Sequence, residues 1–166
     1  MIYRTKMVTF PHSGHHWLVR LLQHALGSEV RYSEKYLTGE TLENAPAINL
    51  EKEHDFNGDA VIFPQCRYIV QIRQLAPALA GWGQGATGNV DLIRHVENQL
   101  PYYHRFIQKW VVSHIPNRLV VPYDTLRAEP VATVAAVLRH VADVGDSRAW
   151  AMAETAVEKD PPNNLA

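Results

Sequence analysis

The stretch Thr9–Leu22, TFPHSGHHWLVRLL, contains the transition that decides the fold of this chain. Residues 7 to 10 form a short apolar run that predicts a strand, and residues 11 to 14 are turn formers. Apolar residues then recur at helical spacing from Trp17 to Leu26, and Gly27 fits a C-terminal cap. A helix beginning near Ser13 or Gly14 presents unpaired backbone N–H groups, so this turn could hold an anion.

The residues of the turn leave several interpretations open. Gly14 allows close approach of a ligand and Ser13 offers a hydroxyl, but Pro-x-Ser-Gly is also an ordinary N-cap turn. No lysine follows Gly14, which disfavours a Walker-type nucleoside triphosphatase. A metal site would need His12, His15 and His16, with His54 as a further ligand. Adjacent helical residues point about 100° apart, so we expect no metal here.

Composition narrows the class of protein. With 166 residues, 46% of them hydrophobic, the chain is expected to form one globular domain over 1–166. The net charge of −1 offers no overall field for nucleic acid or an anionic membrane, so neither is expected as a partner. There is no apolar run of membrane-spanning length and no signal-peptide pattern, so a cytoplasmic location is expected. The single Cys66 excludes an intramolecular disulfide and is expected to be buried.

Strands and helices alternate along the rest of the chain. Further strands are expected at 47–50, 67–72 and 119–122, and helices at 91–115, divided or restarted at Pro101, and at 127–144, with Pro130 in the first turn. No defined element is predicted for residues 28–46, and a polar loop is predicted for 51–59. Residues 73–89 are expected to form a short helix followed by a Gly-rich loop, and residues 158–166 a frayed tail. The alternation predicts an α/β fold with a mainly parallel sheet, whose ligands gather at the carboxyl ends of the strands.

Four segments in order resemble the sulfotransferases that use 3′-phosphoadenosine 5′-phosphosulfate (PAPS). PHSGHHWL is similar to the family's phosphosulfate loop Pro-Lys-Ser-Gly-Thr-Thr-Trp-Leu, with His12 for the lysine and His15 and His16 for the threonines. RYIVQIRQLAPALAGW resembles the strand and helix that bind the 3′-phosphate, with Arg73 retained and Gly81 at the serine position. EKEHDF, with Lys52 and His54, resembles the Lys-x-His pattern of the family. RLVVPYDTL, with Tyr123, resembles the family's strand that runs into Tyr-Glu-Asp-Leu.

The resemblance implies a three-layer α/β sandwich with a P-loop-like sulfotransferase fold and PAPS as donor, without a metal. It implies that His54 is the general base, supported by Lys52, and that Arg73 binds a phosphate. It places the loop residues Ser13, Gly14, His15 and His16 around the phosphosulfate, and Trp17 and Tyr123 beside the adenine.

His12 is the main departure from the family pattern. The family lysine is a fixed positive charge beside the bridging oxygen of the leaving group, and the resemblance implies that His12 takes this catalytic place with a titratable imidazole. A bound dianion should raise its pKa, so cofactor affinity is expected to fall as the pH rises through about 6 to 8. The C-terminal Arg-Lys-Gly loop of the larger family members has no counterpart in the sequence.

Three functions follow as hypotheses. The first is transfer of a sulfuryl group from PAPS to a hydroxyl or amine of a small-molecule or glycan acceptor. The second is a catalytically degenerate domain of the same fold that binds a nucleotide or anion, and the third is a P-loop kinase relative, disfavoured by the missing lysine. Segments 28–46 and 83–100 are expected to face the acceptor, and the sequence does not specify the oligomeric state.

Overall fold

A five-stranded parallel sheet forms the centre of the molecule. The structure, a computed structural model, describes residues 3–34, 48–86 and 92–162. The strands lie in the order β2-β3-β1-β4-β5, and every neighbouring pair is parallel. Their bounds are β1 Tyr3–Thr9, β2 Val30–Glu34, β3 Ile48–Glu53, β4 Arg67–Ile72 and β5 Arg118–Pro122.

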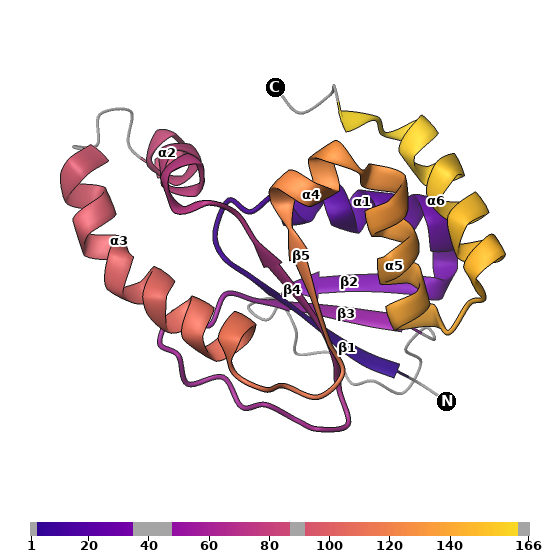
Figure 1. Ribbon diagram of the computed structural model, residues 1–166, viewed down its shortest axis with the longest axis horizontal. Helices are drawn as coiled ribbons and strands as arrows, with labels where there is room; N and C mark the ends of the chain where they lie inside the picture. Colours follow the sequence, from indigo (N-terminus) through magenta and orange to yellow (C-terminus); the bar gives the residue numbers. More distant parts are fainter. Residues whose placement is uncertain (1–2, 35–47, 87–91, 163–166) are drawn as a thin grey trace.

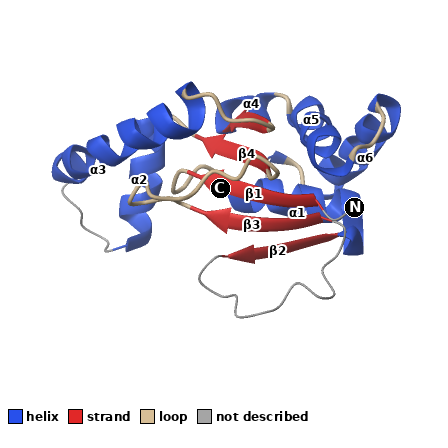
Figure 2. Ribbon diagram, turned by 90° about the horizontal axis from the view of Figure 1, so that it is seen from below, coloured by secondary structure: helices blue, strands red, loops and turns tan. Residues whose placement is uncertain are grey.

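Helices cover both faces of this sheet, which gives three layers (Figures 1 and 2). One face carries α1 (His15–Leu26), α4 (Tyr123–Ala128), α5 (Pro130–Ala142) and α6 (Asp146–Lys159) over one apolar cluster. The other carries α2 (Leu75–Ala86), α3 (Leu92–Ile107) and the π-helical turn η4 (Gln108–Val112) over a second cluster. A short 3₁₀ turn, η1 (Gly27–Glu29), links α1 to β2.

The central strand β1 explains why the core has two halves. Met7 belongs to the cluster under α1, and its neighbour Val8 belongs to the cluster under α2 and α3. Both side chains are fully buried, because successive residues of a strand point to opposite faces and both faces are covered. The short apolar run at residues 7 to 10 therefore identifies a central strand, buried on both faces, that leads into the turn at residues 11 to 14.

Most of the sequence expectations for the elements are confirmed. The α/β class and the parallel sheet are present, and β4 has the expected bounds. The helix after the turn begins at His15, and Gly27 caps it with a φ of 56°. Pro130 occupies the first turn of α5, and Cys66 is buried.

Two expectations about the strands are wrong. Residues 30–34 were expected to have no defined structure, yet they form β2 at the edge of the sheet. The expected loop from residue 51 begins later, because Glu51–Glu53 continue β3. These polar residues stay in the strand because β3 lies between two parallel partners, and Lys52 and Glu53 are each only 8% exposed. Residues 35–47 and 87–91, which include parts of both segments expected to face the acceptor, lie outside the described residues.

Two expectations about the helices are also wrong. The expected Gly-rich loop is partly helical, because α2 continues through Gly81, Gly83 and Gly85. Pro101 neither divides nor starts a helix: α3 runs through it. Pro101 is exposed, so a carbonyl that loses its partner there can be hydrated.

The expected frayed tail is ordered up to residue 162. Helix α6, which the sequence analysis did not predict, ends at Lys159, and Asp160 is only 8% exposed. The Trp17 indole N–H donates to the Asp160 carbonyl at 3.1 Å, and Arg20 Nε donates to Asp160 Oδ2 at 2.8 Å. Residues 163–166 lie outside the described residues.

Candidate functional site

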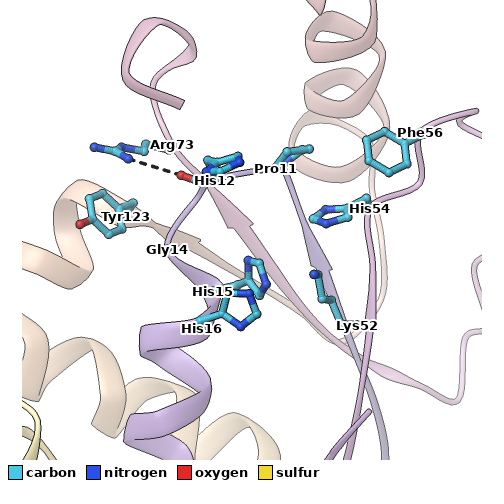
Figure 3. A pocket seen from close by; sticks show the side chains of 10 residues that line it. All are labelled: Pro11, His12, Gly14, His15, His16, Lys52, His54, Phe56, Arg73 and Tyr123. Atoms are coloured by element: carbon cyan, nitrogen blue, oxygen red, sulfur yellow. Dashed lines mark hydrogen bonds between the residues drawn. The ribbon is translucent and has the colours of Figure 1, made fainter. Parts of the chain in front are cut away.

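A cavity of about 610 Å³ opens at the carboxyl ends of the strands (Figure 3). Its walls come from the segments that follow β1, β3, β4 and β5. Strands β2 and β3 lie on one side of β1, and β4 and β5 lie on the other, so the strand order reverses beside β1. Open parallel sheets bind their ligands at such a reversal. The lining residues are Pro11, His12, Gly14, His15, His16, Lys52, His54, Phe56, Arg73 and Tyr123.

The turn after β1 is held by the backbone and by one buried amide. Ser13 N–H donates to the Phe10 carbonyl at 3.2 Å, and Gln71 Nε2 donates to the Ser13 carbonyl at 2.9 Å. Gly14 adopts a φ of 78°, and a Cβ at this position would overlap the Tyr123 ring. Glycine is therefore required at position 14, both by the backbone conformation and by the close approach of Tyr123.

His12 also has a left-handed backbone, with a φ of 55°. Its ring lies beside helix α2, where a Cβ added to Gly81 would stand 3.4 Å from His12 Nδ1. The pKa of His12 is lowered from 6.5, first by burial and then by Arg73, His16 and Lys52. His12 is thus neutral near pH 7 in the ligand-free protein, unlike the lysine of the family loop.

Arg73 follows β4 and reaches across the turn. Its guanidinium lies 4.5 Å from the centroid of the Tyr123 ring, and Nη1 donates to the His12 carbonyl at 3.4 Å. Arg73 Nε is buried and has no hydrogen-bond partner among the described residues. The guanidinium therefore keeps donor capacity for a ligand, with its orientation fixed by the aromatic ring beneath it.

His54 follows β3 with a defined tautomer. Nδ1 lies 2.7 Å from the Thr9 carbonyl oxygen, which can only accept, so Nδ1 carries the proton. In the neutral ring Nε2 then has the lone pair. Burial is the main cause that lowers the pKa of His54 below 6.5, and the Thr9 contact opposes it. His54 is consequently neutral near pH 7, the state that a general base requires.

The loop after His54 is fixed by its neighbour Asp55. The Asp55 carboxylate accepts from Trp110 Nε1 at 2.7 Å, from Lys109 Nζ at 2.8 Å and from the Ala60 N–H at 2.8 Å. The Tyr102 hydroxyl donates to the His54 carbonyl at 2.7 Å. The sequence analysis missed this carboxylate, although the Asn57-Gly58 turn shortly after it was visible.

His15 and His16 lie next to each other, contrary to the expectation from helical spacing. Their ring centroids are 3.9 Å apart, although the residues are consecutive in the first turn of α1. Burial is the main cause that lowers the pKa of His15 to about 2, followed by Lys52 and the other histidines. Neither ring nitrogen of His15 has a hydrogen-bond partner among the described residues.

Lys52, which lines the cavity, forms an ion pair with Glu34. Lys52 Nζ lies 3.3 Å from Glu34 Oε1, which also accepts from the Tyr32 hydroxyl at 3.0 Å. Glu34 was missed because β2 was missed, although the alternation in Val30–Glu34 was a usable signal.

Two predicted site residues do not line the cavity. Trp17 is 1% exposed, and it packs in the core under α6. The buried indole is therefore not exposed to the cavity in which the expected contact with adenine would form. Ser13 is fully buried, and its hydroxyl does not reach the cavity. The remaining predicted residues, His12, Gly14, His15, His16, His54, Arg73 and Tyr123, are brought together.

Comparison with known proteins gives a structural match. No protein-family model and no curated protein matches the sequence. Among 33 matching chains of solved structures is mouse sulfotransferase SULT7A1 complexed with PAP, with a TM-score of 0.67 and 15% identity. The match covers 93% of this chain and 64% of the mouse chain, so this chain spans less than two thirds of that protein. No helix among the described residues has the length and apolar character needed to cross a membrane. At this identity the likeness concerns architecture: the chain has the fold of a sulfotransferase.

Proposed function

We propose that this protein is a sulfotransferase that transfers a sulfuryl group from PAPS to a hydroxyl or amine of a small-molecule or glycan acceptor. The observation that carries the proposal is the composition of one cavity. Arg73, Lys52 and four imidazoles line it at the strand ends, and one of these imidazoles, His54, has the tautomer of a base. The PAP complex of a protein with the same fold supports the choice of donor.

The proposed donor site uses N–H donors and a guanidinium, groups that can themselves bear negative charge. The first turn of α1 offers backbone N–H groups, and the rings of His15 and His16 add donors beside them. Arg73 can bind a phosphate through the donor atoms that its fixed guanidinium leaves available. Tyr123 holds both the turn before α1 and the Arg73 guanidinium in place, because its ring lies against Gly14 and beneath Arg73.

In the proposed transfer step one proton moves, one bond to sulfur forms and one bond to sulfur breaks. His54 Nε2 accepts the proton of the acceptor hydroxyl while the acceptor oxygen bonds to sulfur. The bond between sulfur and the bridging oxygen of the 5′-phosphate breaks, and 3′-phosphoadenosine 5′-phosphate (PAP) leaves with that oxygen. Lys52, 8% exposed at the base of the cavity, stabilises the charge that develops in this step.

A specific observation favours a second candidate function, in which the domain binds the nucleotide without turnover. The His12 ring packs beside Gly81 and is neutral in the ligand-free protein. The fixed charge that the family loop places beside the leaving oxygen is therefore missing, and its absence would slow bond breaking more than binding.

Transfer of a labelled sulfuryl group separates the two candidates. Sulfur-labelled PAPS is incubated with the protein and with hydroxyl and amine acceptors, and labelled product is measured. We expect turnover that falls by about 10²- to 10⁴-fold in His54→Ala, because a general base contributes that much. His114→Ala, an exposed histidine outside the cavity lining, is the matched control. PAP binding without labelled product from any acceptor would favour the binding domain.

A further inference from the structure

His15, His16 and Glu34 bring two nitrogen ligands and one oxygen ligand together. Their ligand atoms all lie within 4.8 Å of one another. The histidines come from the first turn of α1, and Glu34 comes from the end of β2. Figure 3 shows the two imidazoles side by side at the cavity. The start of one element and the end of the next strand thus converge on one small volume.

The burial of His15 is a second, independent sign of a missing ligand. The residue is 6% exposed, and neither Nδ1 nor Nε2 has a partner within the part of the chain that the structure describes. Leaving a buried polar group without a hydrogen-bond partner is unfavourable. An imidazole that is packed beside His16 and left unpaired at both nitrogens is well placed to coordinate an ion.

We propose that His15, His16 and Glu34 bind one divalent transition-metal ion of the zinc class. Imidazole nitrogen and carboxylate oxygen are ligands that zinc accepts, and a tetrahedral ion would draw the three atoms to about 3.3 Å from one another. Three protein ligands leave a coordination position open towards the cavity. The site goes beyond the proposed sulfuryl transfer and does not rest on it, since zinc binding can be measured without PAPS.

Lys52 opposes the ion and gives the proposal a distinctive consequence. Its ammonium lies 3.3 Å from Glu34 Oε1, so it both pairs with a proposed ligand and repels a cation. Removing this charge while keeping the length of the side chain, as in Lys52→Met, should therefore tighten zinc binding. The same substitution should weaken binding of an anion in the cavity, so the two kinds of ligand respond in opposite directions.

Zinc titration by calorimetry, on the full chain freed of metal with a chelator, tests the site. We expect one zinc ion per chain, and affinity reduced by at least about tenfold in both His16→Gln and Glu34→Gln. His16 is exposed and Glu34 is half-buried, so these variants should keep the fold. The matched control is His24→Gln, an exposed histidine in the last turn of the same helix, which should bind zinc as the native chain does.

Two results would overturn the metal site. One is the absence of stoichiometric zinc binding by the native chain. The other is binding that His24→Gln weakens as much as His16→Gln does, which would indicate general association with surface histidines. Tighter zinc binding in Lys52→Met supports the site, and unchanged or weaker binding in that variant counts against it. Failure of PAP binding in the same preparations would contradict the proposed function and leave the metal site standing.

Discussion

At the scale of single residues, His12 departs most from the expected chemistry of the turn. Its left-handed backbone costs about 1–2 kcal/mol for a residue with a Cβ. In that conformation the carbonyl faces Arg73 (Figure 3). The imidazole packs beside Gly81. His12 thus shares the Arg73 side of the cavity, whereas His15 and His16 form the opposite part of the turn.

The pH dependence of PAP binding tests the role of His12. Burial and neighbouring cations lower its pKa below 6.5 in the free protein, and a bound dianion would raise it. The complex then takes up a proton, so affinity should fall as the pH rises from the free pKa to the bound pKa. Calorimetry between about pH 5.5 and 8 should show this fall in the native chain relative to His12→Gln.

The His12→Gln variant also controls for titration of the ligand, whose phosphates have a second pKa near about 6. Because both proteins bind the same ligand, only the difference between their profiles reports His12. Parallel profiles for the two proteins would show that His12 does not change its protonation on binding.

Gly14 gives a prediction about the stability of the turn. Gly14→Ala should destabilise the protein by about 1–3 kcal/mol, because its φ of 78° is strained for alanine and the new Cβ would overlap Tyr123. Urea unfolding measures the loss. Gly58→Ala is the control, since its φ is 73° and its Cβ would meet no atom of the described residues within 4 Å. Equal losses in the two variants would mean that contact with Tyr123 adds nothing.

Prediction of which side chains lie at the cavity succeeded where a side chain directly follows a strand. Arg73 and His54 lie at the cavity because β4 and β3 end just before them. It failed for Trp17, because the sequence shows an aromatic residue in the first turn of a helix but not which face α6 covers. The tautomer of His54 likewise depends on a contact with Thr9, 45 residues away in the chain.

At the scale of elements, the π-helical turn η4 fixes the loop that carries His54. Lys109 and Trp110 lie in this turn, and both donate to the Asp55 carboxylate. The Lys109 ammonium also donates to the carbonyls of Gly58 and Ala60, at 2.9 and 2.7 Å. A break in regular α-helical spacing thus brings two consecutive side chains onto one buried acid.

Asp55→Asn should therefore destabilise the protein by about 2–4 kcal/mol, since it weakens a buried pair and leaves Lys109 with less compensation. Thermal and urea unfolding measure the change. Asp59→Asn, an exposed acid in the same loop, should change stability by less than about 0.5 kcal/mol. If the two substitutions had equal effects, Asp55 would not fix the loop.

Element boundaries were predictable where apolar periodicity was strong and unpredictable where packing overrode composition. Residues 67–72 alternate and then become apolar, and β4 has those bounds. The sequence of Glu51–Glu53 suggested a loop, but the ladders that β3 forms with β1 and β2 keep these residues in the strand. The three glycines of α2 likewise suggested a loop, yet they lie in a helix. Helix propensity predicts structure only weakly, because tertiary contacts can override it.

At the scale of the whole molecule, the end of α6 returns to the helix that follows the decisive turn. Trp17 and Arg20 of α1 both bind Asp160, about 140 residues later. This closure covers the face of α1 that is turned away from the sheet (Figure 1). The sequence offered no sign of it, because the residues around Asp160 are polar and resemble a free tail.

Deletion of residues 158–166 should destabilise the protein by about 1–3 kcal/mol, because the buried Trp17 indole N–H loses its acceptor. Asp160→Asn keeps that backbone acceptor and loses only the ion pair with the half-exposed Arg20, so it should cost less than about 1 kcal/mol. Urea unfolding compares the two. Equal stability of the truncated and native chains would contradict the role of this segment.

Binding of PAP, measured by calorimetry, tests the central claim most directly. We expect one PAP per chain, with affinity reduced about 10- to 150-fold in Arg73→Ala, because hydrogen bonds to a charged group are lost. Arg148→Ala, an exposed arginine of α6, should bind as the native chain does. No binding of PAP by the native chain, or binding that Arg73→Ala leaves unchanged, would contradict the account.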